Sequence, residues 1–250
     1  MFCSVGDEIK FFNTSNHEIV GTAFLKEIEK KEDGGYRLTV DRKVYKVLSQ
    51  ETSNTPTSMY NLDSANKGNI IKNSTFKNSR RHAYIIRSAC SIVENNIMEN
   101  NSGAALEAAN EIHGTSNEGL VPSALTFRNN TVSGEGISSK YVPLKIYSWN
   151  AQLGEQACID GVLIENNTID VPSMYGSINI NSVTGLYMLN NTIKADKPLN
   201  EATQPVDDLN FDYKQNVSAV INILACDVDE NNIKNINIIG ENIAIPYSIK

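Results

Sequence analysis

Residues 81–96, RHAYIIRSACSIVENN, end in a short apolar run followed by Asn-Asn, and this ending recurs along the chain. The six copies lie at residues 70–76, 93–97, 127–132, 164–169, 189–193 and 229–233, the first with Asn-Ser in place of Asn-Asn. A strand-rich unit that repeats with a period in the twenties, lengthened where loops are inserted, is typical of a parallel β-helix. The sequence therefore predicts an all-β chain whose main body is a right-handed parallel β-helix with an Asn ladder.

The Asn pair has a physical role in such a repeat. Asn tolerates the left-handed backbone region better than most non-glycine residues, which suits the sharp bend between two strands. When turns of the helix stack, the Asn side chains lie above one another and can hydrogen-bond along the stack. The alternative is that the pairs are surface turns between ordinary antiparallel strands. The constant phase of the apolar residues relative to the pair favours the β-helix.

Composition limits the classes of partner and cofactor. A net charge of −7 over 250 residues argues against nucleic acid or an anionic membrane as the main partner, and no stretch is long and apolar enough to span a membrane. The four cysteines are widely spaced without a CxxC pair, so we expect free thiols, at least three of them buried. The three histidines lack metal-ligand spacing, so the sequence predicts no metal site and no cofactor.

Residues 1–50 differ from the repeat. Alternating strands separated by short turns with Gly, Asp or Asn predict a small antiparallel β-barrel or sheet, with a cap of the β-helix as the alternative. Residues 51–67 are rich in Ser, Thr and Asn and are expected to connect this part to the rungs of residues 68–250. Long polar loops are expected at residues 110–122, 134–161 and 195–215.

An ordered set of motifs accompanies the rungs. Residues 6–11 and 36–42 are followed by Arg81, by apolar strands at 84–86 and 92–96, and by Gly-Ala-Ala at 103–105. In this order, over roughly residues 5–135, the chain resembles the β-helical α-galactosidases of glycoside hydrolase family 110. The first two motifs are similar to the small β-barrel inserted in that family's β-helix. The resemblance implies an exo-acting enzyme that removes α-1,3-linked galactose with inversion, a glycan or oligosaccharide substrate, and a secreted, periplasmic or cell-surface location.

The chain also departs from the family pattern. His82 stands where the family has glycine, Glu111 stands where it has aspartate, and the loop that follows lacks the family's tryptophan. The family's paired aspartates lie before the barrel, whereas this sequence begins at the barrel. We therefore expect the chain to correspond to the C-terminal part of the family's chain, without its main catalytic aspartates.

Glu111 and Glu118 are the candidate catalytic pair. Inverting glycoside hydrolysis needs a carboxylic acid that protonates the leaving oxygen and a carboxylate that activates water, about 6.5–9.5 Å apart. Both glutamates lie in the loop after the Gly-Ala-Ala motif, and neighbouring rungs are about 4.8 Å apart. Glu107 is a third candidate, whose exposure depends on the face that its strand presents. The alternative is that all three are solvated carboxylates.

Five residues are candidates for binding the substrate: Arg81, His82, His113, Tyr147 and Trp149. The planar guanidinium of Arg81 can make bidentate contacts, although the run around it also fits an exposed turn. His113 shares a loop with the candidate catalytic pair, and a surface histidine is the alternative. Tyr147 and Trp149 offer a flat apolar platform for a sugar, while a lone tryptophan also serves as a loop anchor.

Two further function classes fit the same fold. A non-catalytic β-helix that binds glycan or acts as a structural module is the main alternative, because the paired aspartates are missing. A polysaccharide lyase would need Ca²⁺-binding acidic clusters, and Asp207-Asp208 is too isolated to support one. A solenoid open at one end exposes apolar surface and strand edges, so we expect residues 1–50 to cap it or the chain to form homo-oligomers through solenoid ends or loops.

Overall fold

The computed structural model describes residues 3–14, 18–49, 57–65, 67–113, 116–118, 121–134, 142–148, 157–171, 178–195, 220–224, 226–240 and 247–249. The chain divides into two compact units, residues 1–66 and 67–250. Within the described residues the regular structure is β-strand, apart from a single 3₁₀ turn near the C-terminus.

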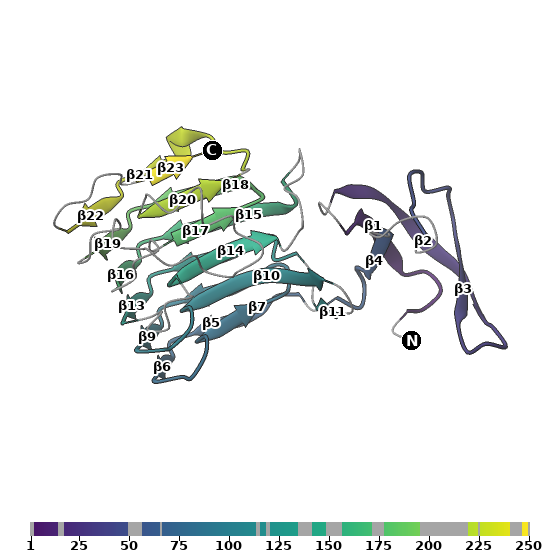
Figure 1. Cartoon of the computed structure of the whole chain (residues 1–250), viewed down its shortest axis with the longest axis horizontal. Coiled ribbons are helices and arrows are strands. Elements are labelled where there is room, and N and C mark those ends of the chain that lie inside the picture. Colours follow the sequence, from purple (N-terminus) through teal and green to yellow (C-terminus); the bar gives the residue numbers. More distant parts are fainter. Residues whose placement is uncertain are drawn as a thin grey trace. The chain divides into compact units, whose positions relative to one another are not determined.

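The second unit contains three sheets, to which successive strands are added in rotation (Figure 1). Sheet 1 contains β5 (Ile70–Lys72), β8 (Ile92–Glu94), β12 (Leu125–Arg128), β15 (Ile159–Glu165), β18 (Val183–Leu189) and β21 (Ile233–Lys234). Sheet 2 contains β6 (Thr75–Lys77), β9 (Ile97–Glu99), β13 (Thr131–Ser133), β16 (Thr168–Val171), β19 (Thr192–Ala195) and β22 (Asn237–Ile239). Sheet 3 contains β7 (Tyr84–Ile86), β10 (Leu106–His113), β14 (Leu144–Ser148), β17 (Ile178–Asn181), β20 (Ile221–Leu224) and β23 (Tyr247–Ile249), with β11 (Ser116–Glu118) antiparallel to β10.

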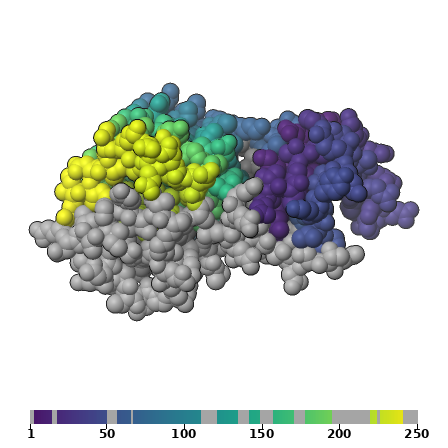
Figure 2. All heavy atoms as spheres, turned by 90° about the horizontal axis from the view of Figure 1, so that it is seen from above, coloured from purple at the N-terminus to yellow at the C-terminus, as the bar shows by residue number. Residues whose placement is uncertain are grey.

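This order of strands is that of a parallel β-helix. Each turn adds one strand to each sheet, and each strand pairs in parallel with its counterpart in the neighbouring turns. The described strands form six turns, and the last of them, yellow in Figure 2, lie at one end of the stack. The predicted all-β solenoid is therefore confirmed.

The core of the β-helix consists of columns of apolar side chains, one from each turn. In sheet 1 the register aligns Ile71, Val93, Phe127, Ile164, Met188 and Ile233. In sheet 2 it aligns Phe76, Met98, Val132, Ile169, Ile193 and Ile238. Most members of these columns are fully buried. Because side chains alternate between the faces of a strand, the residues between them point away from the core.

The first Asn of each pair forms the corner between sheets 1 and 2. Asn95, Asn129, Asn166 and Asn190 all have φ near +55°, in the left-handed region that Asn adopts more readily than other side chains. Asn73 has the same conformation in the first turn. The predicted role of Asn at the bend is therefore confirmed.

The second Asn of each pair points inward and forms a buried hydrogen-bonded ladder. Asn96, Asn130, Asn167 and Asn191 are at most 1% exposed. In the first three, Nδ2 donates to the Oδ1 of the ladder Asn in the next turn, over 3.1 Å from Asn96 to Asn130, 3.1 Å from Asn130 to Asn167 and 3.0 Å from Asn167 to Asn191. The same Oδ1 atoms accept the backbone N–H of the preceding ladder residue, and each Nδ2 also donates to a backbone carbonyl.

The sixth copy of the repeat, at residues 229–233, was wrongly predicted to form a rung corner. The side chain of Asp229 accepts a hydrogen bond from the backbone N–H of Asn231, which begins a 3₁₀ turn at Glu230–Asn232 instead. The corner of that turn is Asn235, whose φ is +54° and whose Nδ2 donates to Asn190 Oδ1 over 2.8 Å. Ile236 follows it where the ladder would place Asn, so the ladder ends there.

The first unit contains a four-stranded antiparallel sheet in the order β3-β2-β1-β4. Its strands are β1 (Glu8–Asn13), β2 (Ile19–Lys30), β3 (Tyr36–Val40) and β4 (Thr57–Asn61). Among the described residues β3 and β4 are edge strands, so the arrangement is an open sheet and not a closed barrel. β4 falls within the stretch expected to be a connector; it pairs with β1, and Tyr60 stacks on Phe12 with ring centroids 4.4 Å apart.

All four cysteines are free thiols, but the prediction that at least three are buried is wrong. Cys90 is exposed at a corner with φ of +56°, because the apolar run around it turns between strands there. Cys3, Cys158 and Cys226 are half-buried, and the Sγ of Cys226 accepts the backbone N–H of Val183.

We expect Asn130→Ala to lower the free energy of unfolding by about 3 kcal/mol, because it leaves the buried Val93 carbonyl and the Asn96 amide without their partners. Asn129→Gly is the matched control. Asn129 is exposed and has positive φ, so glycine fits there and the change should stay within about 0.5 kcal/mol. Urea unfolding of both variants measures the difference, and equal losses would show that the ladder is not a major source of stability.

Candidate functional site

The outer face of sheet 3 differs from the outer faces of sheets 1 and 2. On sheets 1 and 2 the outward-facing side chains are exposed or half-buried, and some form ion pairs across turns, such as Arg128 with Glu94. On sheet 3, outward-facing polar residues are buried: Glu107 is 8% exposed, and Lys145 and Tyr147 are 1% exposed. Buried ionisable groups outside a hydrophobic core are candidates for a functional site.

The buried polar residues of sheet 3 occupy one column of the parallel register. Glu107 pairs with Lys145, Lys145 with Asn179, and Asn179 with Asn222, in four consecutive turns. Neighbouring strands in a sheet are about 4.8 Å apart, so the column presents a carboxylate, an ammonium and two amides at regular intervals. Asn222 Nδ2 donates to Asn179 Oδ1 over 2.9 Å.

Glu107 is the centre of a cluster that we call the sheet 3 cluster: Glu107, His82, Lys145 and Tyr147. The hydroxyl of Tyr147 donates to Glu107 Oε1 over 3.2 Å, and His82 Nε2 lies 3.5 Å from Glu107 Oε2. The Lys145 ammonium lies 4.2 Å from the centroid of the Tyr147 ring, a cation–π contact. Both carboxylate oxygens of Glu107 therefore have polar neighbours, and charges of both signs are held away from water.

His82 is fixed by the Gly-Ala-Ala segment. Its Nδ1 accepts the backbone N–H of Ala104 over 2.9 Å, so the ring proton of the neutral imidazole sits on Nε2, on the side of Glu107. Gly103 permits this contact, because a Cβ at that position would come within 2.9 Å of His82 Nδ1 and 2.8 Å of the His82 backbone nitrogen. Burial lowers the pKa of His82 below its ordinary value, against the opposing effect of Glu107.

The predicted catalytic pair is located by backbone register alone. Glu111 and Glu118 are direct cross-strand partners in the antiparallel pairing of β10 with β11. Glu111 lies four residues beyond Glu107 on β10. His113 pairs with Ser116 at the end of the same hairpin. The side chains of these residues lie outside the described part of the chain, as does Trp149.

Arg81 is exposed and precedes His82 of the cluster in the sequence, and its described hydrogen bonds are made by its backbone. Its carbonyl accepts the N–H of Gly103 over 3.0 Å, and its own N–H donates to Ser79 Oγ over 3.3 Å. The structure thus brings His82 and Tyr147 together with Glu107, and leaves the side chain of Arg81 at the surface.

Lys145, Asn179 and Asn222 were not predicted to be functional residues from the sequence. A signal for them exists, because each is a polar residue between apolar neighbours in a strand: Leu-Lys-Ile, Ile-Asn-Ile and Ile-Asn-Ile. Their alignment in one column became visible only with the register, since the turns that separate them differ in length.

In the part of the chain that the structure describes, no three His, Cys, Asp or Glu side chains are grouped so that they could hold a metal ion. Nor does any described helix have the length and apolar character needed to cross a membrane.

No protein-family model matches the chain. The chain is similar to α-1,3-galactosidase B of Phocaeicola vulgatus, with 25% identity over 214 residues that cover 76% of this chain and 34% of the relative. It thus spans about a third of the length of that relative. The match indicates distant homology to a glycosidase of family 110, which supports the resemblance seen in the motifs at that coarser level.

The lowered pKa of His82 predicts a dependence of stability on pH. The unfolded chain protonates His82 near pH 6.5 and the folded chain only at lower pH, so stability should fall as the pH drops below about 6.5. His82→Asn keeps an oxygen that can accept from Ala104 and removes the titration. We expect urea unfolding of the wild type to lose up to about 1.4 kcal/mol more per pH unit than this variant below that pH. Parallel pH curves would contradict the assigned shift.

Proposed function

We propose that the chain is a carbohydrate-active β-helix that acts on α-linked galactosides, and that the sheet 3 cluster forms part of its sugar site. The observation that carries the proposal is the burial of Glu107 and Lys145 on the outer face of sheet 3. The charged residues on the outer faces of sheets 1 and 2 are partly exposed to solvent instead. Distant homology to an α-1,3-galactosidase supports the choice of substrate class.

The cluster has the chemistry that a sugar needs. Sugar hydroxyls both donate and accept hydrogen bonds, so a carboxylate acceptor beside an ammonium donor can bind neighbouring hydroxyls. Glu107 supplies the first and Lys145 the second, while Asn179 and Asn222 extend the polar column by two turns. Hydrogen bonds to charged groups are stronger away from bulk water, which favours tight and oriented binding.

For the hydrolytic step we propose the pair expected from the sequence, Glu111 and Glu118. Direct cross-strand partners have Cβ atoms about 4.5–5.5 Å apart, and two glutamate side chains diverging from such positions can reach the separation of about 6.5–9.5 Å used in inversion. One would protonate the leaving oxygen, and the other would activate water. β10 carries Glu107 and Glu111, so binding and chemistry would share one strand.

A non-catalytic glycan-binding module is the second candidate. Two observations favour it. Within the described residues, Glu107 is the sole carboxylate of the sheet 3 cluster. The chain also spans only about a third of the length of the similar galactosidase. Such a module would need the sheet 3 cluster for binding but would not need Glu111 and Glu118, the pair in the β10–β11 hairpin.

The decisive experiment measures release of galactose from an α-1,3-galactoside. We expect activity in the wild type, with β-galactose as the first anomer seen by NMR, and a loss of at least about 100-fold in Glu111→Gln and Glu118→Gln. Glu165→Gln, at the end of β15 on sheet 1, is the matched control and should keep full activity. Unchanged turnover in both hairpin variants would remove this pair from the mechanism.

Calorimetric binding of the same galactoside separates the two candidates. Binding that is retained without turnover, and lost in Glu107→Gln, would favour the glycan-binding module. Absence of both binding and turnover in a folded wild-type chain would overturn the assignment of the sheet 3 cluster as a sugar site.

A further inference from the structure

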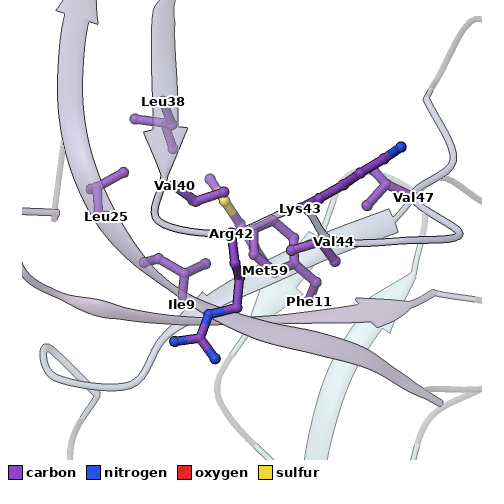
Figure 3. A pocket seen from close by; sticks show the side chains of 10 residues that line it. All are labelled: Ile9, Phe11, Leu25, Leu38, Val40, Arg42, Lys43, Val44, Val47 and Met59. Carbon is purple, nitrogen blue, oxygen red and sulfur yellow. The ribbon is translucent and has the colours of Figure 1, made fainter.

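The sheet of the first unit has a cavity of about 260 Å³ on one face (Figure 3). Eight of its ten lining residues are apolar, including Ile9 and Leu25 from the sheet centre and Leu38 and Val40 from β3. Val47 and Met59 also line the cavity and are 50% and 45% exposed. It is therefore an apolar hollow with an open side.

A cavity of this size, left empty, is expected to lower the stability of so small a unit. Its fully buried apolar side chains, among the described residues, are Ile9, Phe12, Ala23 and Leu25. Unfilled apolar space lowers stability because its walls lose packing contacts, and a small core has little stability to spare. An apolar occupant would restore those contacts. Ligand sites typically have volumes of about 300–1,000 Å³, so this one suits a small ligand.

The two polar lining residues are both cations, and they differ in their partners. Arg42 donates from Nε and Nη2 to the carboxylate of Asp41, over 3.1 and 2.9 Å, and these hydrogen bonds lower the pKa of Asp41 to about 2. Lys43 has no carboxylate partner among the described residues; its ammonium lies 5.1 Å from the centroid of the Tyr45 ring. The ends of the two side chains point away from each other (Figure 3).

We propose that this cavity binds a small amphipathic anion, a medium-chain carboxylic acid, with the alkyl chain against the apolar walls and the carboxylate on Lys43. The walls exclude a polar ligand, since a buried polar group without a partner is costly. Lys43, which has no carboxylate partner among the described residues, selects an anion over a neutral alcohol of the same length. This site is separate from the sheet 3 cluster in sequence and in chemistry.

Three ligands test the two halves of the proposal: decanoate, decanol and butyrate. Calorimetry on the full chain, below the micelle concentration, should show decanoate binding about tenfold more tightly than decanol, and butyrate not binding. Bound decanoate should also raise the Tm of the chain. The proposal is overturned if decanoate does not bind up to its solubility limit, or if butyrate binds equally well.

Variants locate the site. Lys43→Gln should weaken decanoate binding about tenfold and leave decanol unchanged. Lys10→Gln is the control, because Lys10 lies between Ile9 and Phe11 on β1 and faces away from the cavity. Val40→Phe, which fills the cavity, should abolish binding of both long-chain ligands. If that variant does not fold, the comparison of Lys43→Gln with Lys10→Gln decides, and equal affinities in these two variants would exclude Lys43 as the anion partner.

Discussion

The buried Asn ladder is the constraint on which the rest of the β-helix depends. A corner between a strand of sheet 1 and the next strand in sheet 2 leaves backbone N–H and C=O groups pointing into the core, where an unpaired polar group costs free energy. Each ladder Asn satisfies a backbone N–H through Oδ1 and a backbone carbonyl through Nδ2, and also bonds to the next Asn. A side chain without an amide could not do all three, so the ladder position requires the second Asn of the pair, whereas the corner position requires only a residue that tolerates positive φ.

The ladder has a consequence beyond the corner, because it fixes the register of the four turns that it joins. A slip of one residue in a strand would move its apolar side chains out of the core. With the register fixed, a given position in the turn always faces the same way. The sequence can therefore place polar residues in one column of sheet 3, from Glu107 to Asn222, without disturbing the apolar columns beside it.

The parts of this structure that could be predicted from sequence are those fixed by local chemistry. The Asn-Asn corners and the apolar columns follow from neighbours a few residues apart. Residues 229–233 have the same sequence motif, but Glu230–Asn232 form a 3₁₀ turn, because the Asp229 side chain accepts the backbone N–H of Asn231. β4 was missed because its five residues show no regular alternation, and its pairing with β1 joins residues about fifty positions apart.

The candidate site could be predicted less well than the fold, for a related reason. Tyr147 and His82 were found by residue type, but their contact with Glu107 depends on which positions align after loops of unequal length. Lys145 was overlooked because a lysine in a short strand normally faces solvent.

The contrast between two charge pairs shows why the face of sheet 3 is the functional candidate. Arg128 and Glu94 bridge neighbouring turns on sheet 1 with N and O atoms 2.7 Å apart, but the arginine side chain is 42% exposed. Such a pair contributes about 1 kcal/mol or less and requires no function to explain it. Glu107 and Lys145 occupy equivalent positions in neighbouring turns of sheet 3, almost without exposure. Removing these charges from water costs more than their attraction generally returns, and apolar residues would stabilise the turn at least as well. A stability role therefore does not account for them, and this is the reason for the proposal that they bind a ligand.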